Sequence, residues 1–163
     1  MNSSKLHRIT FSAVVGALYA VLTIVLPQTS YGPVQLRFAE ALCVLPFLYP
    51  ETVPGLFIGC LIANLLSPYG AADIVFGSLA TLLSAFLASK MPNKYLSPLP
   101  CIFCNGVIVG GLISWYETGF SSAFLPAFVY NGGTVAAGEA LVCYTLGLLL
   151  LRAMPKIMEK VRK

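Results

Sequence analysis

The stretch Tyr31-Gly-Pro-Val-Gln-Leu-Arg-Phe-Ala-Glu-Ala-Leu42 decides the fold, because it brings Gln35, Arg37 and Glu40 to the start of an apolar segment. Within lipid an ionised side chain costs roughly 2.5–3.5 kcal/mol at a helix centre unless it is paired or lines a polar cavity. Arg37 and Glu40 are three residues apart, so on a helix they share a face and can neutralise each other. They form either an ion pair that only fixes topology or one side of a polar pocket.

The composition of the chain indicates that this stretch lies in a membrane protein. Of the 163 residues, 58% are hydrophobic and only 10% are charged, and the mean hydropathy is +0.84. An average soluble domain has about 25% charged residues. The length allows about five or six spans of ~20 residues each. We therefore expect an all-α integral membrane protein with one transmembrane domain over residues 1–163, no soluble catalytic domain and no nucleic-acid partner.

Apolar segments follow one another along the chain, and we interpret each as a membrane span of a compact six-helix bundle. The predicted spans are 9–26, 35–49, 54–66, 74–88, 99–116 and 134–151. The third is only about 20 Å long, against a hydrocarbon core of ~30 Å, so it must be buried in protein or completed by a loop. Residues 121–130 are open to three interpretations: a loop, a re-entrant segment or an early helical turn.

The basic residues predict the orientation. The N-terminal tail 1–8, Lys90, Lys94 and the C-terminal tail 152–163 carry nearly all the positive charge, and basic loops stay in the cytoplasm. Both termini are then cytoplasmic, and the chain is a multi-pass protein of the cell membrane. Most polar residues of the spans fall in the outer half, where they can build a pocket open to the exterior. The candidate substrate-binding residues are Gln35, Arg37, Glu40, Asn64, Asn105, Tyr116, Asn131 and Glu139.

The polar set suits recognition of a small molecule. Asn and Glu side chains read the donor and acceptor edge of a heterocycle, an anionic Glu can hold an ammonium group, and aromatic side chains can stack on a planar ring. For Glu139, inside an apolar helix, we favour ligand contact or proton coupling over a structural hydrogen bond. For Asp73, which precedes the fourth span, we favour a cap at the N-terminus of that helix over ligand contact.

Motifs for catalysis or metal binding are not found. The chain has no nucleotide-binding loop, no metal-ligand spacing and no serine, cysteine or histidine arrangement for nucleophilic attack. The five cysteines all fall in or beside apolar segments and do not form a disulfide framework. Cys101-Ile-Phe-Cys104 has neither a second pair nor a nearby histidine, so we interpret it as a pair of packing residues. We expect no enzyme activity, no metal and no cofactor.

Small residues recur in the first span. Ala13 and Ala17 are four apart, and so are Gly16 and Ala20 on the adjoining stripe. Small side chains at this spacing let another helix approach closely in lipid. The neighbouring helix belongs either to a partner subunit or to the chain's own bundle.

Three stretches carry a resemblance to a known family: the opening one, Pro54-Gly-Leu-Phe-Ile-Gly-Cys-Leu-Ile-Ala-Asn-Leu-Leu66 and Asp73-Ile-Val-Phe-Gly-Ser-Leu-Ala-Thr-Leu82. With the order of segments, they resemble the QueT family over nearly the whole chain. The resemblance implies a substrate-binding S-component of an energy-coupling factor (ECF) vitamin transporter. Its substrate would be a queuosine precursor, either a 7-deazaguanine base or queuine.

The same resemblance implies a mechanism and partners. An S-component captures its substrate outside and topples in the membrane beside a shared transmembrane subunit, which two cytoplasmic ATPases drive. Ala13 and Ala17 stand where this family presents an Ala-xxx-Ala stripe to that subunit, and Gly16 and Ala20 extend the stripe. Glu139 and Glu40 are the first choices for holding the substrate amine.

Two other classes of function remain alternatives. A free-standing secondary transporter would use Glu139 or Glu40 to carry a coupling proton, although the inverted repeats usual in such transporters are not evident. A membrane scaffold would use the polar residues only to lock its helices together, and it would bind no small molecule.

Overall fold

The computed structural model describes residues 3–30 and 36–161, so Gln35 lies outside the described residues. Every regular element in these ranges is helical, which confirms the all-α prediction. In chain order the elements are α1 (Ser3–Val25), α2 (Pro27–Ser30), η1 (Phe38–Phe47), η2 (Pro50–Thr52), α3 (Val53–Asn64), α4 (Gly70–Ala72), η3 (Asp73–Gly77), α5 (Ser78–Ala88), α6 (Leu99–Cys104), η4 (Asn105–Val109), α7 (Gly110–Thr118), α8 (Phe124–Val142), η5 (Cys143–Gly147) and α9 (Leu148–Val161).

Four continuous helical runs among the described residues are long and apolar enough to cross a membrane: Lys5–Val25, Gly70–Ala88, Leu99–Thr118 and Phe124–Glu159. The chain is thus a multi-pass membrane protein. Single π-helical turns, η3, η4 and η5, interrupt the last three runs. Such turns are frequent at functional sites, because they re-aim the side chains around them.

The second and third predicted spans are short helices. Phe38–Phe47 forms the 3₁₀ helix η1, with Pro46 inside it, and Val53–Asn64 forms α3. At about 2.0 Å rise per residue the 3₁₀ helix still advances roughly 20 Å. The count of six spans and the cytoplasmic location of both termini stay predictions.

The last span begins earlier than the predicted residue 134. Helix α8 starts at Phe124, so residues 124–130 are helical and the connection from α7 is confined to 119–123. Pro126 stands in the first turn of this helix, where its missing N–H leaves no hydrogen bond unmade. At the other end, the helix continues through Pro155 to Val161, so most of the predicted C-terminal tail is helical.

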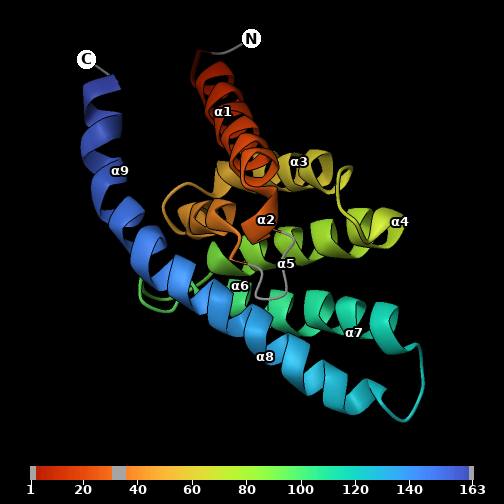
Figure 1. Ribbon diagram of the computed structural model, residues 1–163. Coiled ribbons are helices and arrows are strands. Elements are labelled where there is room, and N and C mark those ends of the chain that lie inside the picture. Colours follow the sequence, from red (N-terminus) through yellow and green to blue (C-terminus); the bar gives the residue numbers. More distant parts are fainter. Residues whose placement is uncertain (1–2, 31–35, 162–163) are drawn as a thin grey trace.

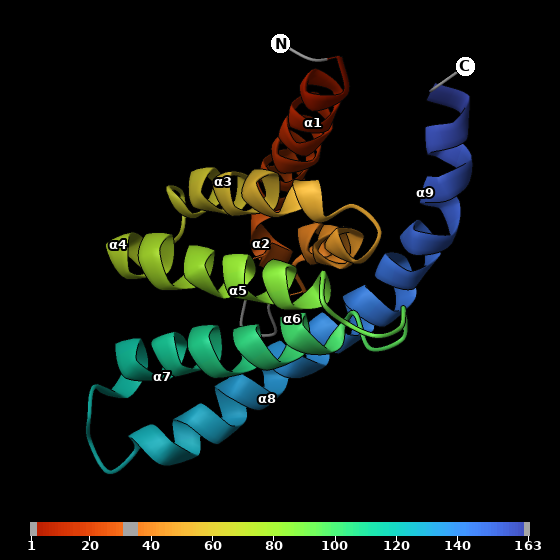
Figure 2. The ribbon, with the colours of Figure 1, turned by 180° about the vertical axis from the view of Figure 1, so that it is seen from behind.

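The helices stack in a regular order. Helix α1 packs on α3, α3 on α5, α5 on α6, and α7 on α8, and both views show α3, α5 and α7 side by side (Figures 1 and 2). The 3₁₀ helix η1 contacts α1, α5, η5 and α9, so it lies at the centre of the bundle. The N-terminal end of α1 and the C-terminal end of α9 lie at the same end of the molecule (Figure 1).

The closest helix contact joins α1 and α3 through glycines. A Cβ atom added at Gly16 would overlap the backbone of Gly55, and one at Gly59 would overlap the backbone of Gly16. The Gly55 N–H donates a hydrogen bond to Ser12 Oγ at 3.0 Å. Gly16 therefore belongs to the chain's own packing.

The first helix thus divides its two small-residue stripes between two environments. Gly16 and Ala20 are buried in the bundle, whereas Ala13 and Ala17 are exposed on the outer face of α1. The prediction that Gly16 and Ala20 extend a surface for a partner subunit is corrected on this geometry. Gly16 lies about 100° around the helix from Ala17, so it faces the backbone of α3 while Ala17 faces outward.

The expected cap at Asp73 is also corrected. The helix begins three residues earlier, where Gly70 turns the chain with a φ of 62°. Asp73 therefore lies inside the first turns of the helix, makes no capping hydrogen bond and is buried.

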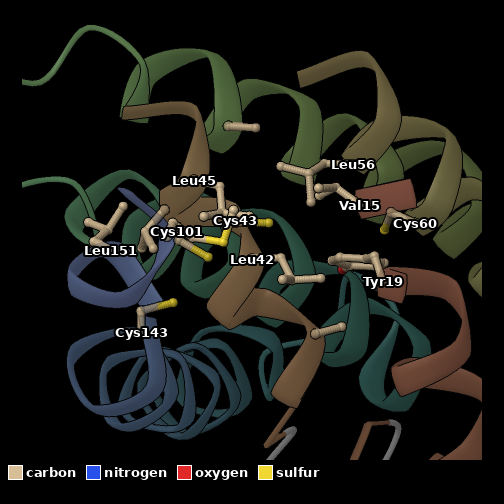
Figure 3. Packing of buried hydrophobic residues seen from close by; sticks show 14 of the residues in the cluster. Val15, Tyr19, Leu42, Cys43, Leu45, Leu56, Cys60, Cys101, Cys143 and Leu151 are labelled. Atoms are coloured by element: carbon tan, nitrogen blue, oxygen red, sulfur yellow. The ribbon is translucent and has the colours of Figure 1, made fainter. Parts of the chain in front are cut away.

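The main hydrophobic core surrounds η1. It contains Tyr19, Leu42, Leu45, Leu56 and Leu151, together with thiols from Cys43, Cys60, Cys101 and Cys143 (Figure 3). The core thus places polar and polarisable groups in the middle of the bundle, where the candidate site begins.

Candidate functional site

Glu40 lies at the centre of a buried polar network. Its carboxylate, on η1, is fully buried and accepts a hydrogen bond through Oε1 from the hydroxyl of Tyr19 on α1. Arg37 Nη1 lies 3.8 Å from the same oxygen, as the spacing of the two residues predicted. The other oxygen, Oε2, is 3.2 Å from Sγ of Cys101 on α6. One carboxylate therefore joins three elements.

Glu139 reaches the same thiol from the opposite side. Its Oε1 accepts a hydrogen bond from Asn105 Nδ2 at 3.1 Å, and its Oε2 lies 3.2 Å from Cys101 Sγ. Glu139 is only 4% exposed, and Asn105, in the π turn η4, is 3% exposed. Glu40, Asn105 and Glu139, predicted to share one pocket, thus meet around Cys101. We call Tyr19, Arg37, Glu40, Cys101, Asn105 and Glu139 the acidic network.

Arg37 connects this network to a second group near the end of α3. Its Nη1 lies 3.9 Å from Cys60 Sγ. Asn64 Nδ2 is 3.4 Å from the same sulfur and donates to the backbone carbonyl of Asp73 at 3.0 Å. Asp73 is 1% exposed, and neither of its carboxylate oxygens has a hydrogen-bond partner among the described residues.

A third group, the rim group, consists of Tyr69, Ser114, Tyr116, Glu117 and Asn131. Asn131 Nδ2 donates to Glu117 Oε2 at 2.8 Å and approaches Ser114 Oγ at 3.2 Å. The rings of Tyr69 and Tyr116 meet edge to face with centroids 5.5 Å apart. Partial burial, with the charges of Glu117 and Asp73 nearby, raises the pKa of Tyr69, so its hydroxyl stays protonated.

The predicted site residues are therefore divided. Arg37, Glu40, Asn105 and Glu139 meet in the acidic network, and Asn64 adjoins it. Tyr116 and Asn131 belong to the rim group, which no hydrogen bond joins to the acidic network within residues 3–30 and 36–161.

The electrostatics of the buried groups are unbalanced. Glu40, Asp73 and Glu139 are buried carboxylates, and Arg37 is the buried guanidinium beside them. The described hydrogen-bond partners of Glu139 are an amide and thiols, which carry no positive charge. A buried carboxylate is stable as an anion only with a cation or several donors, so this arrangement favours a cationic ligand, a metal ion or protons.

Sequence reasoning missed Tyr19 and three of the cysteines. Tyr19 looked like part of an apolar span, although Ser12, Tyr19 and Thr23 lie on one helical stripe and are all buried. That polar stripe was the available signal. Cys43, Cys101 and Cys143 are too far apart in the chain for any spacing rule to connect them.

Comparison with known proteins identifies the family. The pattern of the family described as "QueT transporter" matches residues 9–156. The chain belongs to the QueT transporter family. The "Queuosine precursor transporter QueT" of Lactococcus lactis subsp. cremoris (strain MG1363) is 39% identical over 151 residues, which cover 85% of this chain and 87% of that relative. No solved structure matches the chain.

Family membership confirms the resemblance drawn from the three sequence stretches. The matched residues contain most of α1, the two short central helices and nearly all of the remaining long helices. The acidic network and the rim group therefore both lie inside the family region of a transporter.

Proposed function

We propose that the chain is the substrate-binding S-component of an ECF uptake transporter in the cell membrane, and that its substrate is a queuosine precursor. The name of the Lactococcus relative and the family membership support the substrate class. The observation that carries the proposal is the excess of buried carboxylates over guanidinium groups among the described residues. Glu40 and Glu139 of the acidic network and Asp73 of the adjoining group are buried beside Arg37. Such a network suits a base that bears an aminomethyl cation.

The amide groups beside the carboxylates suit the edge of the base. Asn105 Nδ2 donates a hydrogen bond to Glu139 Oε1 at 3.1 Å, so this amide and this carboxylate lie next to each other. The buried Oδ1 atoms of Asn64 and Asn105 have no hydrogen-bond partner among the described residues. Buried acceptor atoms normally have a hydrogen-bond donor, and a 7-deazaguanine ring carries N–H groups that could donate to these two Oδ1 atoms. Glu139 and Glu40 are then the candidates for the amine.

The exposed face of α1 is the proposed surface for the shared transmembrane subunit. Ala13 and Ala17 leave room there for close helix approach. A shallow groove of about 380 Å³ adjoins Ala13 and is completed by Pro54 and Ile58 of α3. In this proposal the subunit captures the base outside, topples beside its partner and depends on two cytoplasmic ATPases for energy.

The direct test is ligand-induced thermal stabilisation of the purified chain. A ligand that binds only the folded state raises the free energy of unfolding by RT ln(1 + [L]/Kd). This is about 2.7 kcal/mol when the ligand concentration is a hundred times Kd. We expect 7-deazaguanine bases or queuine to raise the melting temperature, and guanine, riboflavin and biotin to leave it unchanged. A shift with riboflavin or biotin alone would overturn the substrate class. No shift in a well-folded sample would favour a scaffold.

A proton-coupled secondary transporter is the second candidate, because the described partners of Glu139 are all neutral. A buried carboxyl group of this kind can exchange a proton during transport. Proteoliposomes that contain only this chain distinguish the two. Uptake driven by a pH gradient would support the second candidate, whereas uptake that requires the ECF partners and ATP would exclude it.

A further inference from the structure

Thiols from three separate parts of the chain meet beside the acidic network. Cys43 is on η1, Cys101 on α6 and Cys143 on η5, and Figure 3 shows them gathered in the core. With Glu40 and Glu139 they form two groups that share Cys101. In the group Glu40, Cys43 and Cys101, and in the group Cys101, Glu139 and Cys143, the ligand atoms all lie within 4.8 Å of one another.

The spacing is close to that of a zinc site. Zn–S bonds of about 2.3 Å and Zn–O bonds of about 2.0–2.2 Å place tetrahedral ligand atoms roughly 3.3–3.8 Å apart. Cys101 Sγ is already 3.2 Å from Oε2 of both Glu40 and Glu139. Cys143 Sγ is 3.9 Å from Oε2 of Glu139. Side-chain movements that shift the ligand atoms by about 1 Å would bring either group to the ligand spacing of a zinc site.

The two carboxylates divide their oxygens between two sides. Both Oε2 atoms face the thiol of Cys101. Oε1 of Glu40 faces Tyr19 and Arg37, and Oε1 of Glu139 faces Asn105. A cation on the Oε2 side would therefore leave the Oε1 side of the network in place.

The ligand types select the kind of ion. Thiolates favour Zn²⁺ and other soft or borderline ions, whereas Mg²⁺ and Ca²⁺ favour oxygen ligands only. The described partners of Glu139 supply no positive charge, and a divalent ion would supply it. All five side chains are buried, as in closed structural sites.

We propose that Cys101, Glu139 and Cys143, with Oε2 of Glu40 as the fourth ligand, bind one divalent ion of the zinc class, and that Cys101 is the central ligand. Each thiol that ligates the ion releases its proton to solvent. The ion would tie η1 to α6 and to the α8–η5 helix at the centre of the bundle. This site goes beyond transport and does not rest on the proposed substrate.

The full-length protein in detergent, with Cd²⁺ as the probe, tests the site. Cd²⁺ bound to thiolates gives an ultraviolet charge-transfer absorption, which reports cysteine ligation directly. We expect about one equivalent to bind the wild type, and Cys101→Ser to abolish the absorption. Cys104→Ser is the matched control, because Cys104 is buried one turn along the same helix run and belongs to neither group. This variant should bind Cd²⁺ like the wild type.

Two further measurements do not depend on how well Cys101→Ser folds. Zn²⁺ should raise the melting temperature of the wild type, Mg²⁺ should not, and a chelator should reverse the rise. Glu139→Gln should weaken Cd²⁺ binding by about tenfold or more. Absence of a Zn²⁺-specific shift in the wild type, or equal Cd²⁺ absorption in the wild type and Cys101→Ser, would overturn the proposal. Both experiments use no base, so their outcome is independent of the transport substrate.

Discussion

The acidic network and the rim group contain similar residue types but differ in burial and in charge balance. Glu139 is 4% exposed and its described hydrogen-bond partners are neutral. Glu117, in the rim group, is exposed and accepts a hydrogen bond from Asn131 at 2.8 Å. Water can solvate the second carboxylate but not the first. We therefore expect the affinity for a cation to reside in the acidic network and not in the rim group.

The largest expected effect is on stability, from removing the cation of the network. Arg37→Met leaves Glu40 beside the other buried carboxylates without its guanidinium. Breaking a buried pair in this way costs about 3–5 kcal/mol. Thermal unfolding in detergent measures the loss, and Arg152→Met is the control, because Arg152 is exposed on α9. If both variants melt alike, Arg37 does not balance the network.

A second contrast between buried and exposed positions lies on α1. Gly16→Leu should destabilise the protein by about 1–3 kcal/mol, because the new side chain meets the backbone of Gly55. Ala17→Leu, one residue along and exposed, should leave the melting temperature unchanged. In the proposed transporter, Ala17→Leu should still block uptake while sparing substrate binding by the isolated chain. Loss of binding in Ala17→Leu would mean that this stripe is internal packing.

Removing the amide of Asn105 should lower the free energy of unfolding by less than breaking the Arg37–Glu40 pair does. It should lower it by more than removing the side chain of any rim residue. Asn105→Ala leaves Oε1 of Glu139 without its donor, at a cost of about 1–3 kcal/mol. Asn93→Ala, in the exposed loop before α6, provides the comparison in the same unfolding measurement. A cost for Asn105→Ala no larger than that for Asn93→Ala would mean that Glu139 has another donor.

The smallest effect is expected at the rim. Glu117→Ala removes an exposed carboxylate, so stability should change by about 0.5 kcal/mol or less. Substrate affinity should fall less than in any variant of the acidic network, which titration of the purified chain can compare. A loss as large as that of Glu139→Gln would move the cation site to the rim group.

Local patterns in the sequence were sufficient for the helical class and for the Arg37–Glu40 pair. Apolar runs with few charges predict membrane helices, and a spacing of three predicts a shared face, so both follow from near neighbours in the chain. The QueT resemblance also required only contiguous stretches.

What the sequence could not supply depends on distant contacts. The choice between the Ala13 and Gly16 stripes required the position of α3. The meeting of Cys43, Cys101 and Cys143 required the packing of three helices, and the separation of Asn131 from Glu139 required the length of α8. The early start of α8, by contrast, has a local signal in the sequence. Pro126 is compatible with the first turn of a helix.

The central claim, that the acidic network holds a cationic base, is tested most directly at Glu139. The affinities of wild type and Glu139→Gln should be compared for an aminomethyl 7-deazaguanine and for its neutral analogue, each with a metal chelator present. A hydrogen bond to a charged group contributes about 1.5–3 kcal/mol, so the variant should lose about ten- to hundredfold affinity for the amine. The neutral base should lose much less. Equal losses for both bases, or no loss for either, would contradict the claim.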